Sequence, residues 1–503
     1  MQTYPIQTGP SAPSTTFLLA SQLGLALNCD LATGLDKTTG AVPVDDGPAI
    51  EAALAGATVH NPLCLLMDGG SYVSGLRLPV GGHWSIWGYG RDTGFFIASG
   101  ANSNGIQNGS ALPIAANAAA PARGTNGNVS IRDITLNCNC NVTTPGNSSG
   151  GGDSRASGAG ANQGYWLLGI YLVGLNGIEI RNVYLTHSPS FNIVFENCGD
   201  WNVDGCHIEG QSGNTDGVHI NGPSDKGRIR GCYFACGDDP IALNAWEGYG
   251  GLITQISIDD CVSYSQTLGR MYTTSNAPPA GAAQALVDGV TFSNCQFTAW
   301  ADNGLYLGLG SGSVGVVADT ITNVTFLNCK FTSTAAVQIS EAVGTLAFIG
   351  CDFIGTTDAC LIAAGTAGNA TVSKLDITNC RLLRNSAGTT SLLGALSNLT
   401  FKRVTITGLA VVDVYGYSGL PIAGLLSLGA GATITGLHIS DLDASNITAL
   451  IASGSSPAVV SGGGVLQTGW AIADSIMAKW TPYVSATSGV PSYRNGAGAV
   501  VAL

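Results

Sequence analysis

Three aspartates stand just before two short stretches in which apolar and polar residues alternate. Asp216 precedes the stretch 218–221, and Asp238 with Asp239 precedes the stretch 241–244. If the stretches are neighbouring parallel strands whose apolar residues face one core, Asp216 lies opposite Asp239, with Asp238 beside them. Such strands are about 4.8 Å apart, and three carboxylates at that spacing cannot all stay ionised without a compensating cation. The pattern therefore predicts a site where one residue type serves as both acid and base.

The same alternation predicts an outward-facing column of side chains along the neighbouring strands. With the apolar pairs pointing inward, this column consists of Tyr171, Val194, His219, Ala242, Arg270, Tyr306 and Gln338. A groove lined by carboxylates, an arginine, a histidine and aromatic rings suits an extended sugar polymer, whose hydroxyl groups take polar contacts and whose ring faces stack on Trp or Tyr. We therefore predict a polysaccharide substrate, bound by Asn214, His219, Asn244, Trp246, Tyr249, Arg270, Asp302 and Tyr306.

One recurring phrase between about residue 129 and residue 442 supplies the elements that position these residues. Examples are VSIRDITLNC, VTFSNCQFTA and LDITNCRLLR. Aligned on its central cysteine or valine, the phrase returns after 22 residues at the least (Cys329 to Cys351) and 34 at the most (Cys261 to Cys295). A short minimum with insertions of variable length is typical of a parallel β-solenoid. We predict an all-β fold, a single-stranded right-handed parallel β-helix.

The extent of the repeat divides the chain into four parts. Residues 1–16, rich in Pro, Ser and Thr, are predicted to be a flexible lead-in, and residues 17–128 an N-terminal cap with the first coils. Within the cap, the sequence DDGPAIEAALAGA from Asp45 predicts a short helix that covers the open end of the stacked sheet. Residues 129–410 are predicted to form the β-helix that carries the groove. Residues 411–503 are predicted to be an irregular C-terminal segment of last coils or an oligomerisation region.

Seven of the fourteen cysteines occupy the central position of the phrase, where a small apolar inward side chain fits. We expect packed thiols there rather than disulfides. Four others lie outside this column and could pair if the protein is secreted, namely Cys138, Cys140, Cys198 and Cys236. The residue before each column cysteine is Gly, Asn or Asp, the types that sharp bends require. A second acidic doublet, Asp259-Asp260, falls in this bend, so we assign it a structural role.

The overall composition excludes several classes of protein. Only 10% of the 503 residues are charged, against about 25% in an ordinary globular domain, and 71 glycines are about twice the usual share. Long buried β-structure with tight turns explains both values. The net charge of −13 argues against a nucleic-acid or anionic-membrane surface, because both need basic patches. No basic-then-apolar signal peptide is visible, and no apolar run approaches a membrane span.

The two acidic turns resemble the polygalacturonase family of glycoside hydrolases, family 28. The hallmark of that family is an Asn-Thr-Asp turn followed one coil later by a doublet of aspartates, here Asn214, Asp216, Asp238 and Asp239. The resemblance covers about residues 165–275 and includes the neighbouring segments SPSF and GRMY. It implies an inverting hydrolysis in which Asp238 is the general acid and Asp216 with Asp239 are the bases that position water. Hydrolysis by carboxylates needs neither a metal nor another cofactor, and we expect none.

The sequence departs from the family pattern in three places. The Gly-His-Gly turn is absent, which concerns the tuning of the acid. The family's Arg-x-Lys motif lacks its lysine here, and a position near His219 where the family has Asp is His. Both changes bear on whether pectin is the substrate. The stretches DDPIALNAWEGYGG and PYVSATSGVPSYRNG are more similar to tailspike-type depolymerases of phages and their bacterial relatives. That resemblance implies an extracellular or virion-associated homotrimer.

Two alternative functions remain open. A polysaccharide lyase of the pectate-lyase type would hold Ca²⁺ in the acidic cluster and use Arg270 as the base that abstracts a proton. A non-catalytic, carbohydrate-binding tail fibre or adhesin could be built on the same solenoid. Dependence on a metal separates the lyase from the hydrolase, and binding without turnover would indicate the adhesin.

Overall fold

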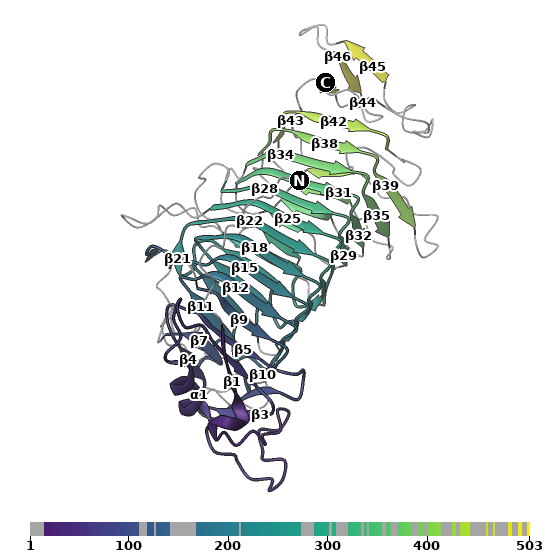
Figure 1. The fold of residues 1–503 in the computed structure, drawn as a ribbon. Helices are drawn as coiled ribbons and strands as arrows, with labels where there is room; N and C mark the ends of the chain where they lie inside the picture. The colour runs from purple at the N-terminus through teal and green to yellow at the C-terminus, as the bar shows by residue number, and fades with distance from the viewer. Residues whose placement is uncertain are drawn as a thin grey trace, which may run out of the picture.

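The chain folds into an elongated stack of β-coils (Figure 1). A computed structural model describes residues 15–109, 118–124, 127–140, 167–210, 213–272, 286–300, 304–307, 320–332, 337–339, 342–354, 359–363, 371–384, 391–395, 400–413, 425–428, 433–442, 459–460, 466–467, 481–484, 491–494 and 500–502. Three long parallel sheets run through these residues. Among the described residues, no helix has the length and apolar character needed to cross a membrane.

Between Val129 and Ala395, each coil contributes one strand to each of the three sheets. The first sheet contains β1 (Thr16–Leu19), β2 (Leu63–Leu66), β5 (Trp84–Trp87), β9 (Val129–Arg132), β12 (Asn176–Arg181), β15 (Gly199–Asp204), β18 (Ser224–Arg230), β22 (Leu252–Asp259), β25 (Leu286–Ser293), β28 (Ile321–Leu327), β31 (Val343–Ile349), β34 (Thr371–Thr378), β37 (Thr400–Phe401), β38 (Val404–Thr407), β41 (Thr433–Ile434), β42 (Leu437–Ser440), β43 (Val459–Val460) and β44 (Leu466–Gln467). The second contains β3 (Gly70–Val73), β6 (Gly94–Ile97), β10 (Thr135–Asn137), β13 (Tyr184–Thr186), β16 (His207–Glu209), β19 (Tyr233–Ala235), β23 (Val262–Ser265), β26 (Gln296–Ala299), β29 (Lys330–Thr332), β32 (Asp352–Ile354), β35 (Arg381–Arg384) and β39 (Ala410–Asp413). The third contains β4 (Leu76–Leu78), β7 (Ile106–Asn108), β11 (Ile170–Val173), β14 (Ile193–Glu196), β17 (Val218–Asn221), β20 (Ile241–Asn244), β24 (Gly269–Tyr272), β27 (Leu305–Leu307), β30 (Val337–Ile339), β33 (Ala359–Ala363), β36 (Ser391–Ala395) and β40 (Leu426–Leu428).

A few elements lie outside these sheets. The 3-10 turn η1 (Ala20–Leu23) and the helix α1 (Gly47–Leu54) stand near the N-terminal end of the stack (Figure 1). The helix confirms the one expected from Asp45, and it buries Ile50 and Leu54 in the core. A short strand β8 (Ala118–Ala119) pairs with β21 (Tyr249–Gly250), and β45 (Thr481–Val484), β46 (Pro491–Arg494) and β47 (Val500–Ala502) form a small antiparallel sheet.

The repeat is a parallel β-helix, as the sequence predicts, because like side chains stack from coil to coil. Phe326 lies between Phe292 and Phe348, with ring centroids 4.7 and 5.0 Å away. Burying one such side chain stabilises the fold by about 1.5–3 kcal/mol, so every coil contributes to its own stability. The parallel pairing continues to β42 and β44, and the division of the chain into four parts stays a proposal.

The bends and the cysteines follow the predicted columns. Asp260, Asn294 and Asn328 all have φ between 52° and 55°, the left-handed region in which Asp and Asn are tolerated. The Asn294 side chain donates to Asp260 Oδ1 at 3.2 Å, which links neighbouring bends. The thirteen cysteines whose side chains the structure describes form no disulfide bonds. The pairing considered for Cys138, Cys140, Cys198 and Cys236 is therefore wrong; each of these side chains is instead buried as a thiol.

The register predicted for the third sheet is confirmed. His219 pairs with Ala242, Ala242 with Arg270, and Arg270 with Tyr306, so these residues form one column. The inward neighbours of this column are fully buried. Since side chains alternate along a strand, the polar groups of the column lie on the opposite, outer face.

Candidate active site

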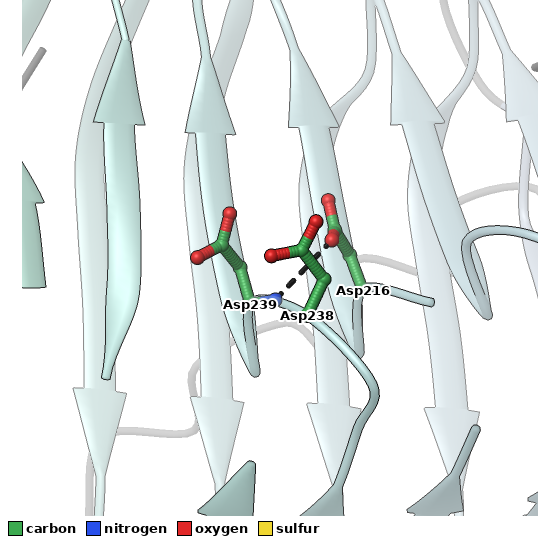
Figure 2. Close-up of side chains that lie close together, drawn as sticks. All are labelled: Asp216, Asp238 and Asp239. Carbon is green, nitrogen blue, oxygen red and sulfur yellow. Dashed lines mark hydrogen bonds between the residues drawn. The ribbon is translucent and has the colours of Figure 1, made fainter. Parts of the chain in front are cut away.

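The three aspartates meet at the turns that lead into β17 and β20 (Figure 2). One carboxylate oxygen from each residue lies within 4.8 Å of the others. Backbone hydrogen bonds hold the two turns together: Gly217 donates to the carbonyl of Asp239 at 2.9 Å, and the Asp239 N–H donates to Asp216 Oδ1 at 3.3 Å. Asp216 and Asp239 are only 3% and 2% exposed, whereas Asp238 between them is partly exposed. Asp238 is therefore the carboxylate that a ligand can reach most easily.

Asp239 is held by two groups from the following coil. The Nε of Arg270 in β24 lies 2.8 Å from Asp239 Oδ2, and the hydroxyl of Thr267 donates to Oδ1. Burial raises the pKa of Asp239 to about 6, against the lowering influence of Arg270, and the nearby charge of Asp216 adds to the increase. Asp239 therefore ionises about two pH units above an ordinary aspartate.

Asp216 is held by His219, three residues later on β17. The distance from His219 Nδ1 to Asp216 Oδ2 is 2.6 Å, and His219 Nε2 lies 3.0 Å from Oε2 of Glu247. The ring stacks on Phe191 with centroids 3.9 Å apart. Burial lowers the pKa of His219, but the hydrogen bonds with Asp216 and Glu247 outweigh that effect and raise the pKa to about 10. The side chain is therefore an imidazolium at neutral pH.

Arg270 and protonated His219 are thus the cations that three close carboxylates require. Each oxygen of Asp216 and Asp239 already has a protein partner. The three carboxylates also lie close enough together to offer oxygen ligands to a cation, so the lyase alternative stays open.

Two of the residues predicted to bind substrate are buried. His219 is fully buried, beneath Asp216. Asn244 is also buried, because the segment 245–251 that follows β20 folds back over it, and its Nδ2 donates to Glu247 Oε2 at 3.1 Å. In this conformation both side chains are buried, so their direct contact with substrate stays a prediction that would require the segment 245–251 to move.

The remaining predicted contacts lie around the cluster. Arg270 is a quarter exposed, and its guanidinium lies 5.2 Å from the ring centre of Tyr306. Asn214 is exposed at the turn, while Trp246 and Tyr249 in the segment 245–251 are partly buried. Trp246 packs partly against the main core, so it presents less surface to a sugar than expected. Asp302 lies outside the described residues.

Four residues of the site were not among those predicted from the sequence. Thr267 and Phe191 lie in turns, and Glu247 lies in the segment 245–251, where no periodicity marks them. Glu196 in β14 pairs in register with Asn221 of β17, so extending the outward column by two residues would have found it. Its carboxylate accepts hydrogen bonds from the Tyr171 hydroxyl and from the Tyr249 N–H, the latter at 3.0 Å. Burial raises the pKa of Glu196 to about 7.

Comparisons with known proteins agree with this architecture. A family model described as glycosyl hydrolases family 28 matches residues 127–344. No curated protein matches the sequence. Tailspike protein 3 of bacteriophage CBA120 is similar in structure at 13% identity, with a TM-score of 0.51 over 97% of this chain and 68% of that chain. The exopolygalacturonase of Thermotoga maritima is 11% identical, with a TM-score of 0.49 over 85% and 92% of the two chains. The family 28 exopolygalacturonase of Yersinia enterocolitica is 12% identical, with a TM-score of 0.48 over 90% and 78%.

Proposed function

We propose that this protein is a glycoside hydrolase that cleaves a polysaccharide by acid–base catalysis with Asp216, Asp238 and Asp239. The observation that carries the proposal is the convergence of the three carboxylates within 4.8 Å of one another. The cluster lies inside the segment that the family 28 model matches. Beside it, Arg270 and Tyr306 are paired across neighbouring coils and are both partly exposed, so they can contact a polymer that runs along the stack.

Asp238 is the general acid in this proposal. A proton shared by the cluster relieves the repulsion among three close charges, and Asp238 is the member nearest to solvent and substrate. It can therefore protonate the glycosidic oxygen as the bond breaks.

Asp216 and Asp239 are the bases that hold and deprotonate the attacking water. Their four oxygens are fixed by His219, the Asp239 N–H, Thr267 and Arg270, and each oxygen keeps a second lone pair for water. A carboxylate held in this way suits the orientation of water better than the formation of a covalent bond to sugar. We infer inversion of the anomeric centre.

The stereochemical outcome has a direct test. Inverting enzymes usually separate their carboxyl groups by about 6.5–9.5 Å and retaining enzymes by about 5–5.5 Å. One oxygen from each of the three carboxyl groups lies within 4.8 Å of the others, a nearest-atom distance that is not the carboxyl separation on which this rule rests. Proton NMR of the first product should show the inverted anomer. A retained anomer would instead make one of the two buried aspartates a nucleophile.

The lyase alternative requires Arg270 to lose a proton. Burial lowers the pKa of Arg270, but Asp239 and Asp238 more than compensate and the net shift is upward, which makes it a poor base. A panel of polysaccharides scored both for reducing ends and for the ultraviolet absorbance of unsaturated uronates distinguishes the reactions. Hydrolysis raises only the first signal, and EDTA should leave it unchanged. Activity that EDTA removes and Ca²⁺ restores would favour the lyase.

We also propose a homotrimer that acts outside the cell or on a virion. The tailspike-like sequence near the C-terminus and the tailspike among the similar structures support this proposal. Light scattering of the purified protein measures the number of chains directly.

A further inference from the structure

The segment 245–251, which we call the covering loop, is tied to the third sheet at several points. Its Glu247 approaches His219 of β17, and its Tyr249 N–H donates to Glu196 of β14 at 3.0 Å. Strand β21 within the loop pairs with β8, a segment more than 120 residues earlier in the chain. Gly248 has φ +60°, and a Cβ there would lie 1.8 Å from Glu196 Oε1, so only glycine fits. The loop therefore has a defined position over the buried polar groups.

One line of contacts runs from this loop to the acidic cluster. Glu247 Oε2 lies 3.0 Å from His219 Nε2, and His219 Nδ1 lies 2.6 Å from Asp216 Oδ2. The two ring nitrogens point in opposite directions, so the ring bridges two carboxylates. Asn244 Nδ2 donates to Glu247, and Asn221 Oδ1 lies 3.0 Å from His219 Nε2.

The two ends of the bridge differ in exposure to solvent. His219 is fully buried and stacked on Phe191, whereas the Glu247 side chain is 20% exposed. Glu196 of β14 and Asp239 of the turn before β20 also act on His219 through their charges. Glu247 is thus the member of the bridge that solvent reaches.

We propose that Glu247 and His219 are positioning residues for the candidate base Asp216. Glu247 keeps the ring of His219 charged and oriented, and the ring holds the Asp216 carboxylate in the direction that water needs. Through Glu247, the covering loop thereby becomes part of the catalytic apparatus, whether or not its Trp246 and Tyr249 also bind the sugar. This inference rests on the proposed hydrolase function.

The variant Glu247→Gln tests the bridge, because the amide preserves size and one acceptor oxygen but removes the charge. We expect kcat to fall about tenfold and KM to change little, as for loss of one charge-assisted hydrogen bond. The pKa of His219 should fall when one of its two carboxylate partners is neutral, so the loss of activity relative to the wild type should grow toward alkaline pH, where the ring loses its charge. Unchanged kcat with an unchanged profile would overturn the proposal.

A second histidine–glutamate pair in the same chain provides the matched control. His207 Nε2 lies 2.5 Å from Glu209 Oε1 on β16 of the second sheet, and both side chains are about one-third exposed. Glu209→Gln removes the same charge from a pair that does not touch the aspartates. It should leave kcat and the pH profile as in the wild type. An equal loss in both variants would mean that the effect of Glu247→Gln is not transmitted through Asp216.

A measurement that needs no substrate separates this inference from the proposed function. In protein labelled with ¹⁵N-histidine, NMR at pH 8 should show His219 with both ring nitrogens protonated, and Glu247→Gln should weaken that signal while Glu247→Asp retains it. A neutral His219 in the wild type would refute the bridge even in an active enzyme. A charged His219 in a protein without turnover would sink the hydrolase function and leave the bridge intact. Thermal unfolding of each variant shows whether the fold survives.

Discussion

The chain carries the doublet Asp-Asp at 238–239 and again at 259–260, and the two copies have opposite surroundings. Asp259 is partly exposed, accepts hydrogen bonds from the hydroxyls of Ser257 and Ser293, and lies 3.4 Å from Nε of Arg228. Asp260 is exposed and forms the bend between the first two sheets. The other doublet faces a third carboxylate and contains a side chain that is only 2% exposed.

The difference shows that position within the coil decides what a carboxylate can do. At the bend, hydroxyls and a nearby arginine surround Asp259 while Asp260 is exposed, so the doublet serves the backbone turn. At the turn into the third sheet, a neighbouring coil supplies another aspartate, and the surrounding protein buries Asp216 and Asp239. Burial and like charge then disfavour ionisation, which is the condition for acid–base chemistry near neutral pH.

The largest effect is expected from replacing Asp238, the proposed acid. Asp238→Asn is nearly isosteric but cannot donate a proton to a leaving group, so kcat should fall about 10³-fold while the fold and substrate binding survive. Reducing-end assays measure the rate and calorimetry the affinity. Near-normal turnover would mean that Asp238 is not the general acid and that the two doublets do not differ in function.

A smaller and pH-dependent effect is expected from Arg270→Ala. Arg270 lowers the pKa of Asp239, which is about 6 in the intact site, so its loss should raise that pKa. Asp239, a proposed base, would then be protonated over a wider acidic range, and the acidic limb of the kcat/KM profile should move to higher pH. We expect about a tenfold loss at pH 5 and less at pH 8, where Asp239 stays mostly ionised. A uniform loss at every pH would indicate that Arg270 only binds substrate.

The smallest effect is expected at the bend. Asn tolerates the left-handed conformation that Asp260 adopts with φ of 55°, and other bends of this solenoid already use Asn. Asp260→Asn should change the free energy of unfolding by less than about 0.5 kcal/mol and leave turnover unaltered. Chemical denaturation and the same rate assay measure both quantities. A catalytic defect would show that the second doublet also belongs to the site.

Sequence patterns predicted the periodic part of this structure and missed the part that is not periodic. Val218 and Ile241 could be matched because a one-residue slip would turn every apolar side chain outward, so the register of Asp216 and Asp239 followed. The burial of His219 and Asn244 depends on the path of the covering loop. No repeat encodes that path; it follows from contacts such as Gly248 against Glu196, which are distant in sequence.

The column of seven cysteines makes local unfolding of the solenoid measurable coil by coil. Each of these thiols is at most 2% exposed, and each marks a different coil from Cys206 to Cys380. Coils in such a stack contact mainly their neighbours, so partial unfolding proceeds coil by coil from a free end. A brief pulse of an alkylating reagent therefore labels only the coils that are open at that moment, and peptide masses read out their order. The helix α1 covers the N-terminal end of the stack. We therefore expect the coils near Cys380 to unfold first and the coils that carry the acidic cluster to unfold later.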